Sequence, residues 1–214
     1  MWRCISVNIT STFDAWLLEK DALVKKVQKE MCEHRFTHTL AVAKESIILA
    51  KAFDFSEQDA KRLFVASLLH DYTKAYDTAH QIALAKEHNI PLTQDDLASP
   101  PVLHSRTAAV LCQSVFAQDV DSEILEAIRC HTVGKKKMSL FDKLLFLADY
   151  IEETRIHPTC QETRKAFYEA LASGENKEAV LNQTLRRVLQ NTIDHVAKQN
   201  GTLHSDSLTM LENL

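Results

Sequence analysis

The chain has 214 residues, of which 45% are hydrophobic and 25% charged, and its formal net charge is −4. This length fits one globular domain that can build a hydrophobic core without disulfide bonds. Because the sequence holds only three Gly and four Pro, it lacks the turn residues that folds of many short strands need, and we expect an all-α fold.

The composition also indicates which binding partners and which cellular compartment to expect. No stretch approaches about 18 uninterrupted apolar residues, and the first ten residues have neither the basic lead nor the apolar run of a signal peptide. The negative net charge gives no general attraction to nucleic acid. The five cysteines are scattered without C-x-x-C spacing, which is typical of reduced thiols. We therefore expect a cytoplasmic protein with no membrane or nucleic-acid partner.

Hydrophobic periodicity and capping residues predict the helices. Residues 1–13 show no helical period and form an N-terminal extension, followed by one domain over residues 14–214. The predicted helices cover residues 14–31, 36–53, 56–71, a short segment within 78–88, 104–117, 121–131, 139–152, 160–173 and 176–199. Gly134 and Gly201 follow two of these helices, where a C-cap favours glycine.

Four of the ten histidines, His38, His70, His104 and His131, lie on or beside apolar helical patterns. The other six have polar neighbours and are expected at the surface. A buried imidazole without a partner is costly, so each of the four needs a backbone carbonyl or another partner. Four such histidines in one chain favour a metal site.

Two carboxylates complete the candidate ligand set. Asp71 follows His70 at the end of an apolar helix, and Asp149 lies in the most apolar helix of the chain, where it must be neutralised or paired. A helix N-cap or a salt bridge with Arg155 or Lys74 is the structural alternative for Asp149. Histidine and carboxylate ligands without thiolate suit iron, manganese or zinc. Six ligands exceed what one catalytic ion takes, so we expect two ions bridged by Asp71.

Cationic side chains lie near these candidate ligands in the sequence. Lys74 and Arg155 lie one to two helical turns from them and are candidates to clamp phosphate groups. Residues 135–137 are three lysines after Gly134, and for at least two of them we favour a solvated basic loop.

Four motifs resemble those of one bacterial family. They are Arg35-Phe36-Thr37-His38-Thr39-Leu40, Leu68-Leu69-His70-Asp71-Tyr72-Thr73-Lys74, Ile128-Arg129-Cys130-His131-Thr132-Val133-Gly134, and Met138-Ser139 with Phe146-Leu147-Ala148-Asp149-Tyr150-Ile151-Glu152. In this order they resemble the YqeK family of HD-domain phosphohydrolases, which are symmetrical bis(5′-nucleosyl)-tetraphosphatases. The resemblance covers about residues 30–206, including Leu203-His204-Ser205-Asp206-Ser207.

The resemblance implies an HD-domain helical bundle with two divalent or mixed-valence metal ions, with iron favoured over manganese and zinc. One ion would be held by His38, His70, Asp71 and Asp149, and the other by Asp71, His104 and His131. Substrate-binding residues implied by the matching motifs are Arg35, Lys74, Arg129, Thr132, Gly134, Lys135 and Arg155. Lys135 stands where the family often has Arg, and Glu153 where it usually has Pro.

The reaction implied is hydrolysis of a dinucleoside tetraphosphate, such as diadenosine tetraphosphate, into two nucleoside diphosphates by a metal-activated water. Lys74 and Arg155 would neutralise charge in the transition state, and no side chain would act as a covalent nucleophile. Hydrolysis of other (deoxy)nucleoside phosphates and a nucleotide-binding regulatory module are the alternatives. A cyclic-dinucleotide phosphodiesterase is disfavoured because its Gly-Tyr-Pro signature is absent. The oligomeric state, with a homodimer as one option, is left open.

Overall fold

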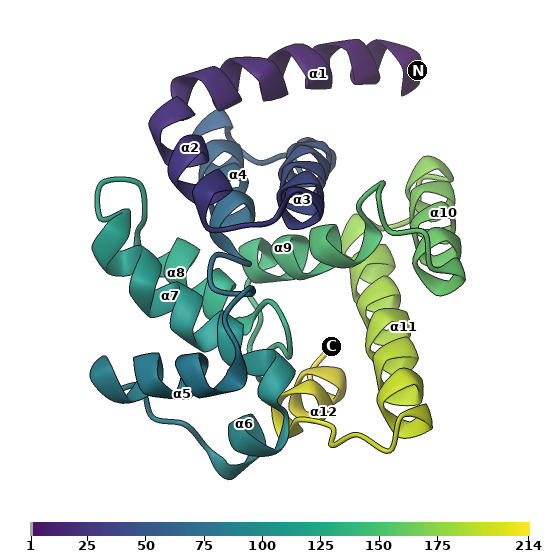
Figure 1. Ribbon diagram of the computed structural model, residues 1–214. Helices are drawn as coiled ribbons and strands as arrows, with labels where there is room; N and C mark the ends of the chain where they lie inside the picture. Colours follow the sequence, from purple (N-terminus) through teal and green to yellow (C-terminus); the bar gives the residue numbers. More distant parts are fainter. Residues whose placement is uncertain (1) are drawn as a thin grey trace.

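The computed structural model describes the backbone of residues 2–214 and the side chains of residues 9–214. Within this part of the chain the secondary structure is helical and contains no strand, which confirms the all-α prediction (Figure 1). In chain order the helices are α1 (Trp2–Glu19), α2 (Asp21–Lys29), α3 (Glu33–Ala52), α4 (Glu57–Leu69), α5 (Thr78–Glu87), α6 (Gln94–Ala98), the 3-10 turn η1 (Pro100–Val102), α7 (Leu103–Val115), α8 (Ser122–Cys130), α9 (Leu140–Ile151), α10 (Pro158–Ala172), α11 (Lys177–Lys198) and α12 (Ser205–Glu212). None of the described helices is both long and apolar enough to cross a membrane.

The core is built around α9, which crosses the middle of the molecule between α3 and α8 at one end and α10 and α11 at the other (Figure 1). Its sequence is apolar on nearly every face, as expected of a helix surrounded by others. Leu144, Leu145 and Leu147 are completely buried, and so are Leu68 and Leu69 at the end of α4. Two apolar helices therefore carry Asp149 and His70 into the interior.

Capping side chains fix several helix starts where the sequence places them. Ser56 accepts a hydrogen bond from the Asp59 backbone N–H at the start of α4. Ser139 and Asp142 form a capping box at the start of α9. Because these caps are local, the predicted starts of α4 and α9 lie within one residue of the observed ones.

The helix boundaries predicted for the N-terminal segment are wrong, while the domain boundary at residue 14 stays a prediction. Instead of a non-helical extension over residues 1–13 and a helix over 14–31, the chain forms α1 from Trp2 and then α2, with a break at Lys20. Ile9 and Trp16 are buried, and Trp16 packs edge-on against Phe64 with ring centroids 5.6 Å apart. Ile9, Phe13 and Trp16 have the spacing of one helix face. The pattern therefore begins earlier than predicted, and packing on α4 stabilises it.

Two further differences concern short elements. Helices α6 and α12 were not predicted; they contain five and eight residues and bury few apolar side chains, so their periodicity is weak. Gly201 is not the left-handed residue after α11, because Asn200 takes that conformation with φ of 52°. Gly201 instead donates its N–H to the Val196 carbonyl, as the residue after a left-handed C-cap does.

Candidate metal centre

The six predicted ligands converge from three helices and from the turns that follow two others. His38 comes from α3, His104 from the first turn of α7, and Asp149 from α9; His70, Asp71 and His131 follow the ends of α4 and α8. All four imidazoles are buried, and His70 is completely so. Residues separated by up to 111 positions in the sequence therefore share one interior site.

The ligand atoms form two adjoining groups. The donor atoms of His38, His70 and Asp149 lie within 4.8 Å of one another, and so do those of His70, Asp71 and His131. His104 adjoins the second group, because its Nε2 is 3.1 Å from both Asp71 Oδ1 and His131 Nε2. His70 belongs to both groups, which places it at their shared edge.

Asp71 presents one carboxylate oxygen to each group. Its Oδ2 lies 3.5 Å from His70 Nε2 and 3.9 Å from His38 Nε2. Its Oδ1 lies 3.1 Å from His104 Nε2 and 3.6 Å from His131 Nε2. This orientation is the one that a carboxylate bridging two cations requires.

Hydrogen bonds at Nδ1 aim each Nε2 at the centre. In three histidines Nδ1–H donates to the carbonyl three residues earlier: His70 to Ser67 at 2.6 Å, His104 to Pro101 at 2.7 Å and His131 to Ile128 at 2.7 Å. Because a carbonyl can only accept, these bonds place the proton on Nδ1 and leave the Nε2 lone pair free for a metal.

The donor set fits metal ions. The Nε2 atoms of His38 and His70 are buried and make no hydrogen bond in the described part of the chain, although Asp149 Oδ1 lies 3.0 Å from His38 Nε2. Unsatisfied buried nitrogens beside two carboxylates are costly unless a cation joins them. Nitrogen and oxygen donors of this kind suit borderline divalent ions.

A histidine must be neutral to bind a metal ion, and the pKa values of His70 and His104 meet this condition, whereas that of His38 does not. Burial lowers the pKa of His70 to about 4, and burial together with the Lys74 charge lowers that of His104 to about 4. For His38, burial is outweighed by the carboxylates of Asp149 and Glu152, which raise its pKa to about 9. For Asp71 burial is likewise outweighed, and the surrounding histidines and Lys74 hold its pKa well below the ordinary range.

The profile of the HD domain matches residues 35–154. The chain belongs to the HD-domain family. A protein of Halalkalibacterium halodurans named symmetrical bis(5′-nucleosyl)-tetraphosphatase is 30% identical, over 92% of this chain and 97% of its own length. One of the same name from Bacillus subtilis is 30% identical, over 89% of this chain and 94% of its own length. These relatives confirm the family that the motifs predict.

A solved structure shows the same fold. The crystal structure of a predicted HD superfamily hydrolase involved in NAD metabolism, from Clostridium acetobutylicum, has a TM-score of 0.78 to this chain at 27% identity, covering 90% of this chain and 95% of that one. The HD-domain helical bundle is thereby confirmed along nearly the whole chain.

Glu152 is a residue of this HD-domain site that the sequence analysis missed. Its side chain is completely buried at the end of α9, and its Oε1 accepts from His38 Nδ1 at 3.0 Å. The hydroxyl and N–H of Thr154 also donate to the Glu152 carboxylate. Like Asp149, Glu152 is an acidic residue at an otherwise apolar helix end, and that signal could have found it.

Three cationic side chains contact the ligands. Arg35 Nη1 lies 2.7 Å from Asp71 Oδ2, and Lys74 Nζ lies 3.1 Å from His104 Nε2 and 4.0 Å from Asp71 Oδ1. Arg155 donates to Asp149 Oδ1 at 2.5 Å and to the Asp149 carbonyl at 3.0 Å. Asp71 and Asp149 therefore each have an arginine partner.

The remaining predicted substrate residues have different surroundings. Thr132 Oγ1 lies 3.2 Å from His131 Nε2, so it belongs to the centre. Arg129 and Lys135 instead both donate to the carboxylate of Glu126. Gly134 has a left-handed φ of 77°, and a Cβ there would clash with Met210. Arg129, Lys135 and Gly134 as substrate contacts therefore stay predictions.

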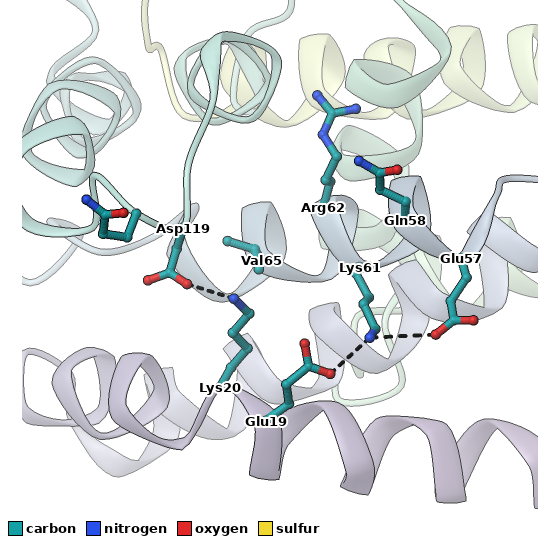
Figure 2. A pocket seen from close by; sticks show the side chains of 9 residues that line it. Glu19, Lys20, Glu57, Gln58, Lys61, Arg62, Val65 and Asp119 are labelled. Carbon is teal, nitrogen blue, oxygen red and sulfur yellow. Dashed lines mark hydrogen bonds and ion pairs between the residues drawn. The ribbon is translucent and has the colours of Figure 1, made fainter.

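Two cavities differ in their distance from the predicted ligands. One of about 300 Å³ borders the centre at Lys74 and His104 and is also lined by Tyr76, Gln81 and Pro101. A larger cavity of about 520 Å³ between α1, α4 and the loop before α8 contains none of the six ligands (Figure 2). Its Lys20 and Lys61 are bound to acidic side chains of the same cavity. Of these two cavities, the one at Lys74 and His104 borders the predicted ligands.

Proposed function

We propose that this chain is a metal-dependent phosphohydrolase that cleaves dinucleoside tetraphosphates symmetrically, giving two ADP from diadenosine tetraphosphate. The observation that carries the proposal is the convergence of four His side chains and Asp149 around Asp71, whose two oxygens face opposite groups. The two relatives named for this reaction match the chain along nearly its full length.

In the proposed ligand assignment, each ion would be bound by one of the two carboxylate oxygens of Asp71. His38, His70, Asp71 and Asp149 would hold the first ion, and Asp71, His104 and His131 the second. Iron is the metal that we infer, with manganese and zinc as alternatives of the same ligand preference. Two such ions, when bound, activate a water and stabilise the attacking and leaving oxygens of a phosphoryl displacement.

The two proposed catalytic cations lie on opposite sides of the ligand set. Lys74 lies against His104, and Arg155 lies against Asp149. A polyphosphate laid across the centre would thus meet a cation on each side. Their charges would stabilise the negative charge that develops on the phosphate oxygens as the bond breaks.

A protein nucleophile is not part of the proposal. Cys130, the thiol nearest in sequence to His131, is completely buried and donates to the Ala127 carbonyl. Burial raises its pKa, which disfavours the thiolate that a nucleophile needs. The attack is therefore left to water.

One incubation with diadenosine tetraphosphate tests the proposal. We expect ADP as the sole nucleotide product, loss of turnover after chelation of the metal, and recovery when the metal is returned. Formation of ATP with AMP would contradict symmetrical cleavage. Turnover only of (deoxy)nucleoside mono-, di- or triphosphates would favour the broader HD-family alternative, and absence of turnover of any nucleotide would favour a regulatory module. Cytoplasmic location, bacterial origin and a homodimer stay predictions.

A further inference from the structure

A buried charged network lies beside the second half of the metal centre and outside its ligand set. At its middle is Arg106, on α7 two residues after His104, with a side chain only 8% exposed. A buried guanidinium must be paired and hydrogen-bonded, and each of its partners comes from a different segment.

The Arg106 guanidinium joins four helices. Its Nη1 donates to the Arg129 carbonyl at 3.0 Å, in the last turn of α8 and two residues before His131. Its Nε donates to Asp96 Oδ1 on α6 at 3.1 Å, and its Nη2 to Asp206 Oδ2 on α12 at 2.9 Å. One rigid planar group thus ties the helix that carries His104 to the helix end that carries His131.

The two acidic partners are themselves held in place. Asp96 is 2% exposed and accepts from the backbone N–H and hydroxyl of Thr93. His204 Nδ1 accepts from the Asp206 N–H, so the proton lies on Nε2 and is donated to Asp96 Oδ1, 3.2 Å away. The Asp96 carboxylate therefore has several donors, and Arg106 docks on a fixed acceptor.

Helix α12 also holds the turn after His131 directly. Ser207 Oγ donates to the Val133 carbonyl at 3.2 Å. Met210 is buried against Gly134, at the place where a Cβ on that glycine would lie. Helix α12 therefore packs against residues 133 and 134.

The spacing of the two histidines depends on how α7 and α8 pack against each other and on the bonds that join their ends. The Nδ1 of His104 and that of His131 each bond to a carbonyl three residues earlier in their own segment, which orients each ring but does not join α7 to α8. Yet their Nε2 atoms lie only 3.1 Å apart. The separation of the two ligands is therefore set by how the two helix ends are held.

We propose that Arg106 is a positioning residue for the second metal ion: its bonds to the Arg129 carbonyl, Asp96 and Asp206 hold His104 and His131 at the spacing that one ion requires. The inference rests on the two-ion centre of the proposed function. Arg106 touches none of the ligands, and it acts through the helices that carry them.

The test is titration of metal-free protein with Mn²⁺ by calorimetry. Arg106→Lys keeps the buried charge but replaces the planar fork with a compact ammonium on a flexible stem, which cannot reproduce the three bonds that Nε, Nη1 and Nη2 make in different directions. We expect it to bind the first ion as the wild type does and the second about 10- to 100-fold more weakly, the usual effect of losing support behind a ligand. Asp206→Asn, a partly exposed site that tolerates change, should weaken the same ion by a smaller factor.

Arg62→Lys is the matched control. Arg62 also bridges two helices, from α4 to Asp121 and Glu123, but at the opposite end of α8 (Figure 2 shows its side chain). The Arg62→Lys variant should have a lower melting temperature than the wild type but the same affinity for both Mn²⁺ ions. Wild-type Mn²⁺ binding by Arg106→Lys, or equal weakening of both ions, would overturn the inference while leaving the proposed function intact. Fewer than two ions on the wild type would overturn the two-ion centre itself, and the inference with it.

Discussion

The two sides of the metal centre are supported by different chemistry. On the side of His38 and Asp149 the support is ionic: Glu152 accepts from His38, and Arg155 binds Asp149. Behind the rings of His104 and His131 the acceptors are neutral, because each Nδ1 donates to a backbone carbonyl. A carboxylate behind a histidine makes it a stronger metal ligand than a carbonyl does. The first ion should therefore bind more tightly than the second.

The helix ends are held on both sides by an arginine. Arg164 donates to the carbonyls of Ile151, Glu152 and Arg155 after α9, just as Arg106 donates to the Arg129 carbonyl at the end of α8. Terminal carbonyls of a helix have no partner within it, and a guanidinium supplies one. The two sides therefore share a backbone support and differ in what lies behind the histidines.

The largest expected effect on activity comes from the two cationic side chains, Lys74 on the side of His104 and Arg155 on the side of Asp149. Lys74→Ala and Arg155→Ala should each lower kcat/KM about 10- to 1,000-fold with metal content unchanged, because a charge that meets the phosphates acts mainly in the transition state. Steady-state kinetics on diadenosine tetraphosphate and metal analysis measure both quantities. If either variant loses metal before activity, that residue is only a counter-charge to Asp71 or Asp149.

Arg155→Lys sharpens this test. It keeps the charge beside Asp149 but removes the planar guanidinium. We expect kcat to fall. Full activity would show that Arg155 merely balances the Asp149 carboxylate, to which it is already bonded.

The next effect isolates the ionic support of the first side. Glu152→Gln should weaken the first ion about 10- to 100-fold, since the His38 ring loses its charged acceptor, while the second ion is unaffected. Glu153→Gln is the matched control, because Glu153 is exposed and binds only Lys44 among the described contacts. Mn²⁺ titration compares the two. Equal affinities in both variants would show that Glu152 does not support His38.

The first side also carries a buried acid whose ionisation depends on pH. Burial raises the pKa of Glu45 to about 7, against hydrogen bonding from Tyr168 and the charge of Arg164. Glu153 and Glu152 add to the increase. Protonated Glu45 therefore stabilises the fold below about pH 4.5, and this contribution is lost as the pH rises through about 7.

Metal-free protein measures this effect through its melting temperature. The wild type should lose several degrees relative to Glu45→Gln between pH 4.5 and 7, and the difference should be constant at higher pH. If the melting temperatures of the two proteins change in parallel between pH 4.5 and 7, the raised pKa of Glu45 is contradicted.

The smallest effect concerns the backbone of the second side. Gly134→Ala should destabilise the metal-free protein by about 1–3 kcal/mol, because it combines a left-handed φ with a clash against Met210. Gly174→Ala has a φ of 84° but open space around it, so it should cost only about 1 kcal/mol. Chemical denaturation gives both values. Equal costs would mean that α12 does not press on Gly134.

The comparison also shows which parts the sequence could predict. The convergence of the six candidate ligands was predictable because polar groups in apolar helices stand out, and local caps such as Ser56 and Ser139 marked the helix starts. Helices α6 and α12 were missed because long-range bonds to Arg106 and Val133, rather than their own periodicity, hold them. Pairing through space cannot be read from spacing in sequence.

The same limit applies to the charged residues. Arg129 and Lys135 lie near His131 in sequence, but their shared partner is Glu126. Glu152 was predicted only as the last residue of a helix, but its side chain turns inward to His38. In each case the direction of the side chain depends on a residue that folding brings close.

The central claim is that one carboxylate, Asp71, serves both sides of the centre. The most direct test is to count the Mn²⁺ ions bound at equilibrium by metal-free wild type, Asp71→Asn and His104→Ala. The account predicts two ions on the wild type, one on His104→Ala and none held tightly by Asp71→Asn, since the amide loses the charge that both ions share. An Asp71→Asn variant that still binds one ion with wild-type affinity would contradict it.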